Sequence, residues 1–210
     1  MVQAADKKTI FADLALLLVT VFWGSNVVVV KGALEVIDPF TYLGLRFSLA
    51  AVLLVPFFWK RLRKATIAEF RDGCLIGVLL FSAFAFQTVG LVYTTPANSG
   101  FITGISVVIV PYLYFLVTRR SPGWWAYLGG FLAAVGLYLL SANETMGFGF
   151  GDMLTLICAF LFAAHVVSIA ICVKRSDTMV LAITQIAFTR LASFLMAVIF
   201  EPADAFFKQP

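Results

Sequence analysis

Residues 11–30 read FADLALLLVTVFWGSNVVVV, an apolar run that holds one charged residue, Asp13. An α-helix of this length rises about 30 Å, which matches the hydrocarbon core of a bilayer. Lys7 and Lys8 precede the run, so a cleaved signal peptide is the alternative. The apolar core of a signal peptide is shorter, however, and no A-x-A cleavage site follows the run. We therefore predict a membrane-spanning helix that stays in the protein.

Six more apolar runs of similar length follow, separated by short breaks that hold Pro, Gly and charged residues. They cover residues 40–59, 73–92, 97–117, 124–141, 152–173 and 180–200. A membrane β-barrel would alternate polar and apolar residues over about ten positions, and apolar stretches such as residues 81–86 do not alternate. We predict an all-α membrane protein with seven transmembrane helices.

The composition excludes a soluble domain. Of the 210 residues, 62% are hydrophobic and 12% are charged, whereas a soluble domain carries about a quarter charged residues. The three cysteines lie far apart in apolar runs, so we interpret them as small helix residues. The sequence contains no HExxH, GxSxG or GxxxxGK[ST] motif. We therefore expect no enzymatic activity, no cofactor, no metal and no nucleic-acid partner.

The basic residues predict the orientation in the membrane. If the N-terminus is cytoplasmic, eleven of the 15 Lys and Arg residues fall in cytoplasmic segments, and only Lys31 and Lys208 fall on the other side. An excess of Lys and Arg marks the cytoplasmic loops of membrane proteins. We expect a bacterial inner (plasma) membrane protein with the N-terminus in the cytoplasm and the C-terminus outside.

The chain shows a weak internal repeat at an offset of 139 residues. This offset aligns residues 12–14 with 151–153 and Asn26 with His165. With five extra residues in the next loop, residues 41–46 align with residues 185–190. A unit of five helices inverts the second copy in the membrane, as in many secondary transporters. We predict a first five-helix unit over residues 1–141 and the first two helices of an inverted second unit over residues 151–210.

Several residues of the first unit together resemble a known family. These are Phe22-Trp23-Gly24-Ser25-Asn26, Lys31, Pro39 with Arg46, Tyr93, Ala97 to Ser99, Pro111, and Gly129 with Gly136. The pattern resembles an EamA-type carrier of the drug/metabolite transporter superfamily, specifically over residues 12–141 and more loosely from residue 151. The resemblance implies ten helices in two inverted halves around a central cavity that moves small metabolites, often outward. On this basis we expect a chain truncated after the seventh helix.

Candidate binding residues lie on three of the predicted helices and the turn that follows the third. Trp23 and Asn26 share one face in the middle of the first helix, where they would stack on and hydrogen-bond a substrate. Alternatively, Asn26 bridges to a neighbouring helix. Lys31 either reaches the membrane interface or attracts a substrate carboxylate or phosphate. The polar residues around the next outer turn, which line the cavity or bond within the bundle, are Gln87, Tyr93 and Asn98.

Three further polar positions lie inside predicted spans. His165, the one histidine, lies near mid-depth and either contacts substrate or protons or hydrogen-bonds another helix. Arg46 is interpreted as a helix anchor, whereas Arg190 allows both interpretations. Small residues form stripes that predict helix-packing surfaces, namely Gly100 with Gly104, and Gly129, Ala133 and Gly136.

The function predicted from these features is transport of a small polar metabolite, with an amino-acid-like solute as one candidate. We expect alternating access and efflux. The expected partners are the lipid bilayer and the solute, together with either a second copy of the chain or the missing C-terminal helices. The alternative is a non-transporting membrane fragment whose helices only pack together.

Overall fold

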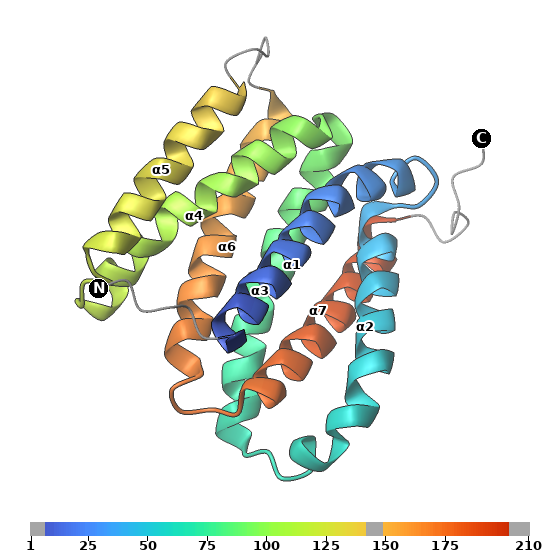
Figure 1. Ribbon diagram of the computed structural model, residues 1–210. Coiled ribbons are helices and arrows are strands. Elements are labelled where there is room, and N and C mark those ends of the chain that lie inside the picture. The colour runs from blue at the N-terminus through green and yellow to red at the C-terminus, as the bar shows by residue number, and fades with distance from the viewer. Residues whose placement is uncertain (1–6, 142–148, 202–210) are drawn as a thin grey trace.

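The computed structural model describes residues 7–141 and 149–201, and within these segments the chain forms seven α-helices and no strand (Figure 1). This confirms the predicted all-α fold class. The helices are α1 (Lys7–Ala33), α2 (Pro39–Leu62), α3 (Ile67–Tyr93), α4 (Pro96–Thr118), α5 (Trp124–Ser141), α6 (Phe150–Cys172) and α7 (Thr178–Phe200).

The helices have the length and composition of membrane spans. Five of them, α2, α3, α4, α6 and α7, are long and apolar enough to cross a bilayer. The helices α1 and α5 contain shorter apolar segments within the described residues, at Leu17–Ala33 and Trp124–Gly136. Together these helices support an integral membrane protein.

The start of α3 differs most from the prediction, because the helix begins at Ile67 and the apolar run begins at residue 73. A capping box at Thr66 explains the difference. Its hydroxyl accepts a hydrogen bond from the Glu69 backbone N–H at 3.3 Å, and the Glu69 carboxylate accepts one from the Thr66 N–H at 2.8 Å. This reciprocal pair satisfies two amides at the helix start, so α3 extends beyond the membrane-spanning run.

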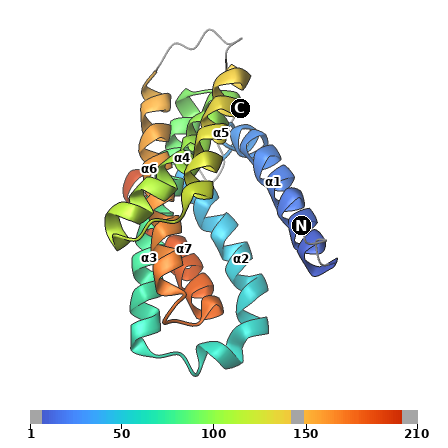
Figure 2. The same ribbon diagram turned by 60° about the vertical axis from the view of Figure 1, so that its left-hand side comes forward.

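The central helix is α3, which packs against α6 and α7 and also touches α1, α2 and α4. The main buried cluster lies between α2, α3 and α6 and consists of Leu43, Phe47, Leu80, Ala83, Phe84, Cys158 and Phe162. Helix α1 makes its main contacts with α4 and α3 and leans away from the rest of the bundle (Figure 2). Its large side chains, such as Phe22 and Val29, are therefore mostly exposed.

The closest helix contacts occur at glycines other than those predicted. A β-carbon at Gly73 would lie 2.6 Å from Thr184, and one at Gly90 would lie 2.9 Å from the Gly151 carbonyl oxygen. In contrast, a β-carbon at Gly100, Gly129 or Gly136 would meet nothing within 4 Å in the described part of the chain. The predicted packing role was wrong for these three glycines, because a shared helix face does not show that another helix lies against it.

The helix ends indicate the register of the predicted internal repeat. Ala33 ends α1 and Cys172 ends α6, while Pro39 begins α2 and Thr178 begins α7. Both pairs are 139 residues apart, so the loop contains no insertion and the predicted five-residue shift was wrong. Arg46 therefore corresponds to Gln185. Helices α1 and α6 run in opposite directions (Figure 1), as an inverted repeat requires.

Candidate functional site

A cavity of about 200 Å³ lies between α1, α3 and α4. Small residues on two of these helices keep it open, because a β-carbon at Gly24 or Gly100 would meet nothing within 4 Å. The lining residues are Thr20, Trp23, Gly24, Val27, Gln87, Gly100, Thr103, Gly104, Ser106 and Val107. The cavity therefore combines small, aromatic and hydrogen-bonding groups.

The polar centre of this cavity is Gln87. Its side chain is buried, and its Nε2 donates a hydrogen bond to the Thr103 hydroxyl at 3.0 Å. No other hydrogen bond of the Gln87 side chain occurs among the described residues, although an amide offers two donor hydrogens and an acceptor oxygen. The remaining donor and acceptor are therefore available to a solute in the cavity.

Trp23 begins a chain of aromatic rings that crosses the bundle. Its ring meets Phe162 of α6 edge to face, with centroids 6.2 Å apart. Phe162 meets Phe84 of α3 at 5.1 Å, and Phe84 meets Phe47 of α2 at 5.3 Å. Edge-to-face contacts of this kind stabilise ring pairs and fix their orientation. The rings thus connect the cavity wall on α1 to the core between α2, α3 and α6.

Asn26 and His165 are not among the residues that line the cavity. His165 is buried, and its Nε2 lies 2.8 Å from Oε1 of Gln185 on α7, to which it donates a hydrogen bond. Asn26 is half-buried, and its side chain makes no hydrogen bond within the described residues. The two repeat-equivalent positions thus have different surroundings.

Lys31 joins α1 to the end of α3. Its ammonium donates to the carbonyl oxygens of Leu91, Val92 and Thr94 at 2.6, 3.0 and 3.0 Å. A lysine has three N–H donors, so these bonds use all of them. The positive charge also lies at the negative end of the α3 dipole. In this structure Lys31 anchors a helix and does not reach the cavity.

The last two predicted site residues also lie outside the cavity. Tyr93 is exposed and packs edge to face on Phe150, with ring centroids 5.5 Å apart. Asn98 lies in the first turn of α4, where its backbone N–H donates to the Thr95 hydroxyl at 3.1 Å. Of the seven predicted residues, the structure therefore places Trp23 and Gln87 on the cavity.

Sequence reasoning missed the particular residues of α4 that line the cavity. Its cavity residues Gly100, Thr103, Gly104 and Val107 follow the spacing i, i+3, i+4 and i+7, which places them on one helix face. A threonine within a stripe of small residues is the signal that would have identified this wall. The sequence analysis assigned the glycines to packing and left Thr103 unassigned.

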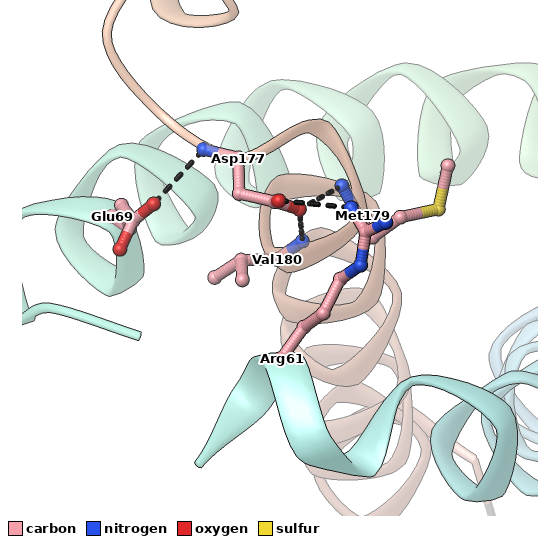
Figure 3. A network of polar contacts seen from close by, with 5 residues as sticks. All are labelled: Arg61, Glu69, Asp177, Met179 and Val180. Carbon is pink, nitrogen blue, oxygen red and sulfur yellow. Dashed lines mark hydrogen bonds and ion pairs between the residues drawn. The ribbon is translucent and has the colours of Figure 1, made fainter. Parts of the chain in front are cut away.

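A polar cluster at one end of the bundle joins the α6–α7 loop to α2 and α3 (Figure 3). The Asp177 carboxylate accepts hydrogen bonds from the N–H groups of Met179 and Val180 and pairs with Arg61 at 3.0 Å. The Asp177 N–H donates to Glu69 at 2.9 Å. The Met179 N–H is the largest cause of a lowered pKa for the Asp177 carboxyl, and Arg61 adds to it.

Two acids form the corresponding contacts at the opposite end. Asp152 accepts hydrogen bonds from the Thr94 hydroxyl at 2.5 Å and from the Gly149 N–H at 2.9 Å. Glu201 accepts from the N–H groups of Phe40 and Thr41 at 2.6 and 2.9 Å and from the Thr41 hydroxyl at 2.7 Å. Contacts between the two predicted units therefore occur at both ends of the bundle.

Comparison with known proteins identifies the family. The family model for EamA-like transporters matches residues 10–142, which is more than half of the chain. The chain belongs to the EamA-like transporter family. This EamA-like chain is similar to two proteins of Archaeoglobus fulgidus, each named an uncharacterized transporter.

The first relative is 39% identical over 184 residues, which cover 87% of this chain and 56% of the relative. The second is 32% identical over 164 residues, which cover 73% of this chain and 55% of the relative. The EamA-like chain thus spans about half the length of the curated relatives that it matches. No solved structure matches it.

Proposed function

We propose that the chain forms a membrane carrier that exports a small polar metabolite and has no enzymatic activity. The observation that carries this proposal is the cavity between α1, α3 and α4, where Gln87 lies buried opposite the ring of Trp23 in a member of a transporter family. An apolar cavity with a few fixed hydrogen-bonding groups is the usual form of a small-molecule site. The volume of about 200 Å³ favours a solute of a few heavy atoms.

Alternating access would use the contacts at the two ends of the bundle. The cluster around Asp72, Glu69 and Asp177 closes one end, and the bonds of Asp152 and Glu201 close the other. In an inverted-repeat carrier the two units rock around a central site, so these contacts break in turn. The distribution of Lys and Arg supports a cytoplasmic location for the Asp177 end.

Two protein partners are proposed for the carrier, either a second copy of the chain or helices that follow α7. Helix α1 offers a surface for either partner or for lipid, because large apolar side chains such as Leu18, Phe22 and Val29 are exposed over much of its length. A non-transporting fragment is the rival function.

Filling the cavity tests the proposal. Gly100→Leu places a side chain in the cavity, because nothing lies within 4 Å of the added β-carbon. Gly32→Leu is the matched control, since that position is equally open but does not line the cavity. Cells that express the wild type or Gly32→Leu should release one or a few polar metabolites that cells expressing Gly100→Leu retain, as measured by mass spectrometry of the medium.

The outcome that contradicts transport is equally clear. If the medium is the same for the wild type, Gly100→Leu and an empty vector, while equal amounts of folded protein are present in the membrane, the chain is a packing fragment. If Gly32→Leu blocks release as strongly as Gly100→Leu, the cavity is not the transport site.

A further inference from the structure

Arg46 is a charged residue within a candidate membrane span, and no charged partner for it lies among the described residues. It is the eighth residue of α2 and is half-buried. Its guanidinium lies over the Phe84 ring, with Cζ 4.8 Å from the ring centroid, and 5.8 Å from the centroid of Phe47. It makes no hydrogen bond or ion pair within the described residues. The rings offset part of the cost of the charge but leave the five N–H donors of the guanidinium unused.

The repeat shows what the equivalent positions do in the second unit. At the offset of 139 residues fixed by the helix ends, Arg46 corresponds to Gln185 and Asn26 to His165. In the second unit the two side chains bond directly at 2.8 Å. In the first unit Asn26 and Arg46 bond neither to each other nor to any other described side chain, and α1 leans away from α2 (Figure 2). The two positions are thus hydrogen-bonded to each other in the second unit and unbonded in the first, and we call Asn26 and Arg46 the open pair.

The residues around this open pair favour an anion. A guanidinium with free donors within a membrane requires water, an acid or a carbonyl group, and its planar fork fits a carboxylate with two parallel hydrogen bonds. The Asn26 amide on α1 offers a further donor, from the position that corresponds to His165 in the bonded pair of the second unit. Lys31, the basic residue that precedes Arg46 in the chain, is bonded to three carbonyl oxygens. A single free cation matches the single charge of a carboxylate better than a phosphate dianion.

We propose that Arg46 and Asn26 bind the carboxylate group of the transported solute between α1 and α2, beside the ring chain of Trp23, Phe162 and Phe84. This assignment rests on the proposed carrier function and narrows its substrate to carboxylic acids. Arg46 provides the charge and the paired donors, and Asn26 provides the third donor. When the site is occupied, the first unit acquires a polar link between its first two helices like the one that His165 and Gln185 form in the second unit.

Chemical modification of arginine tests the site without knowledge of the natural solute. The purified chain in detergent is treated with phenylglyoxal, and the extent of reaction at each arginine is measured by peptide mass spectrometry. The probes are propionate, propionamide and methylphosphonate at equal ionic strength. Propionate should slow the reaction at Arg46 about threefold or more once its concentration exceeds the dissociation constant by a few fold. Propionamide and methylphosphonate should have little effect.

Arg190 is the matched control within the same sample. It is exposed in the middle of α7 and makes no hydrogen bond or ion pair within the described residues. Propionate should not protect it. In Asn26→Leu the protection of Arg46 should weaken while its basal reactivity stays, and Arg46→Gln, which introduces the residue of the second unit, should fold and lose release of the exported metabolite.

Several outcomes overturn the assignment. If Arg46 does not react with phenylglyoxal under any condition, its guanidinium already has a partner and is not free to bind a solute. If propionate protects Arg46 and Arg190 equally, the protection is a general ionic effect and not binding at a site. Protection by methylphosphonate alone excludes the carboxylate. If release of the metabolite depends on Gly100 while propionate leaves Arg46 unprotected, the carboxylate site is contradicted and the carrier function is supported. If propionate protects Arg46 while no variant affects release of the metabolite, the carboxylate site is supported and the carrier function is contradicted.

Discussion

Asp72 and Arg175 form a two-point ion pair across 103 residues of sequence, with Nε to Oδ2 at 2.8 Å and Nη2 to Oδ1 at 2.7 Å. The Ser176 hydroxyl adds a third hydrogen bond to the same carboxylate at 3.0 Å. The Asp72 side chain is only 4% exposed, whereas that of Arg175 is 58% exposed. The pair fastens the α6–α7 loop to the start of α3, so a carboxylate covered by protein depends on a partner from the other predicted unit.

Removing this partner should weaken the packing of α7 on α3. In Arg175→Gln the buried Asp72 carboxylate loses two charge-assisted bonds, and leaving a covered charge without its partner is costly. We expect a lower melting temperature in detergent, with partial recovery in Arg175→Lys. Arg120→Gln is the control, because that side chain has no polar partner in the described residues. A melting temperature equal to that of the control variant would show that the pair contributes no stability.

The glycines of α3 should tolerate no side chain, in contrast to those of the cavity. In Gly73→Ala the new β-carbon would lie 2.6 Å from Thr184 Cβ, which requires a shift of α7. Overpacking of this kind costs about 1–3 kcal/mol. Gly100→Ala meets nothing within 4 Å and should keep wild-type stability. Thermal unfolding of the two alanine variants side by side checks the contrast, and equal stabilities would contradict the described α3–α7 contact.

Acid should weaken the cap at the start of α7. The pKa of Asp177 is lower in the folded protein because backbone N–H groups donate to its carboxylate. Its stabilisation is therefore complete above the unfolded pKa of about 3.9 and is lost as the pH falls through the lower folded pKa. Melting temperatures of the wild type and Asp177→Asn, measured from about pH 6 down to about pH 3, should converge as the pH falls. A constant difference would exclude titration of this group.

The orientation makes a separate prediction. A reporter fused after Arg120 should lie in the cytoplasm, and one fused after Asn143, which lies outside the described residues, should lie on the other side. Alkaline phosphatase and green fluorescent protein fusions give opposite signals for the two locations. Signals reversed at both sites would invert the proposed topology and, with it, the side closed by Asp177.

Helix positions were predictable because membrane spans require long apolar runs, and capping signals refine their ends. The Thr66 to Glu69 box explains why α3 starts before its apolar run, and this signal is visible in the sequence. The register of the repeat was harder to predict. Aligning Arg46 with Arg190 suggested an insertion, whereas the helix ends align Arg46 with Gln185.

Site residues were less predictable, because the sequence gives a face and a depth but not the neighbouring helix. Trp23 and Gln87 line the cavity, and their role in binding stays a prediction. Lys31 lies at the end of an apolar run, which is typical of a residue at the membrane interface. In the structure it instead caps the end of α3 through carbonyl oxygens, and no sequence pattern identifies these partners. Likewise, the spacing of Gly100 and Gly104 predicts a packing surface, whereas in the structure both residues line the cavity.

The bonds of Glu201 have a consequence for the order of assembly. The first amides of α2 donate to a carboxylate that is 160 and 161 residues further along the chain. The first amides of any helix lack a partner within the helix itself, so α2 is still without this cap when it emerges from the translocon. The cap forms only after the end of α7 has been synthesised and folded back beside the start of α2. A nascent chain stopped shortly before residue 201 would therefore leave the start of α2 uncapped.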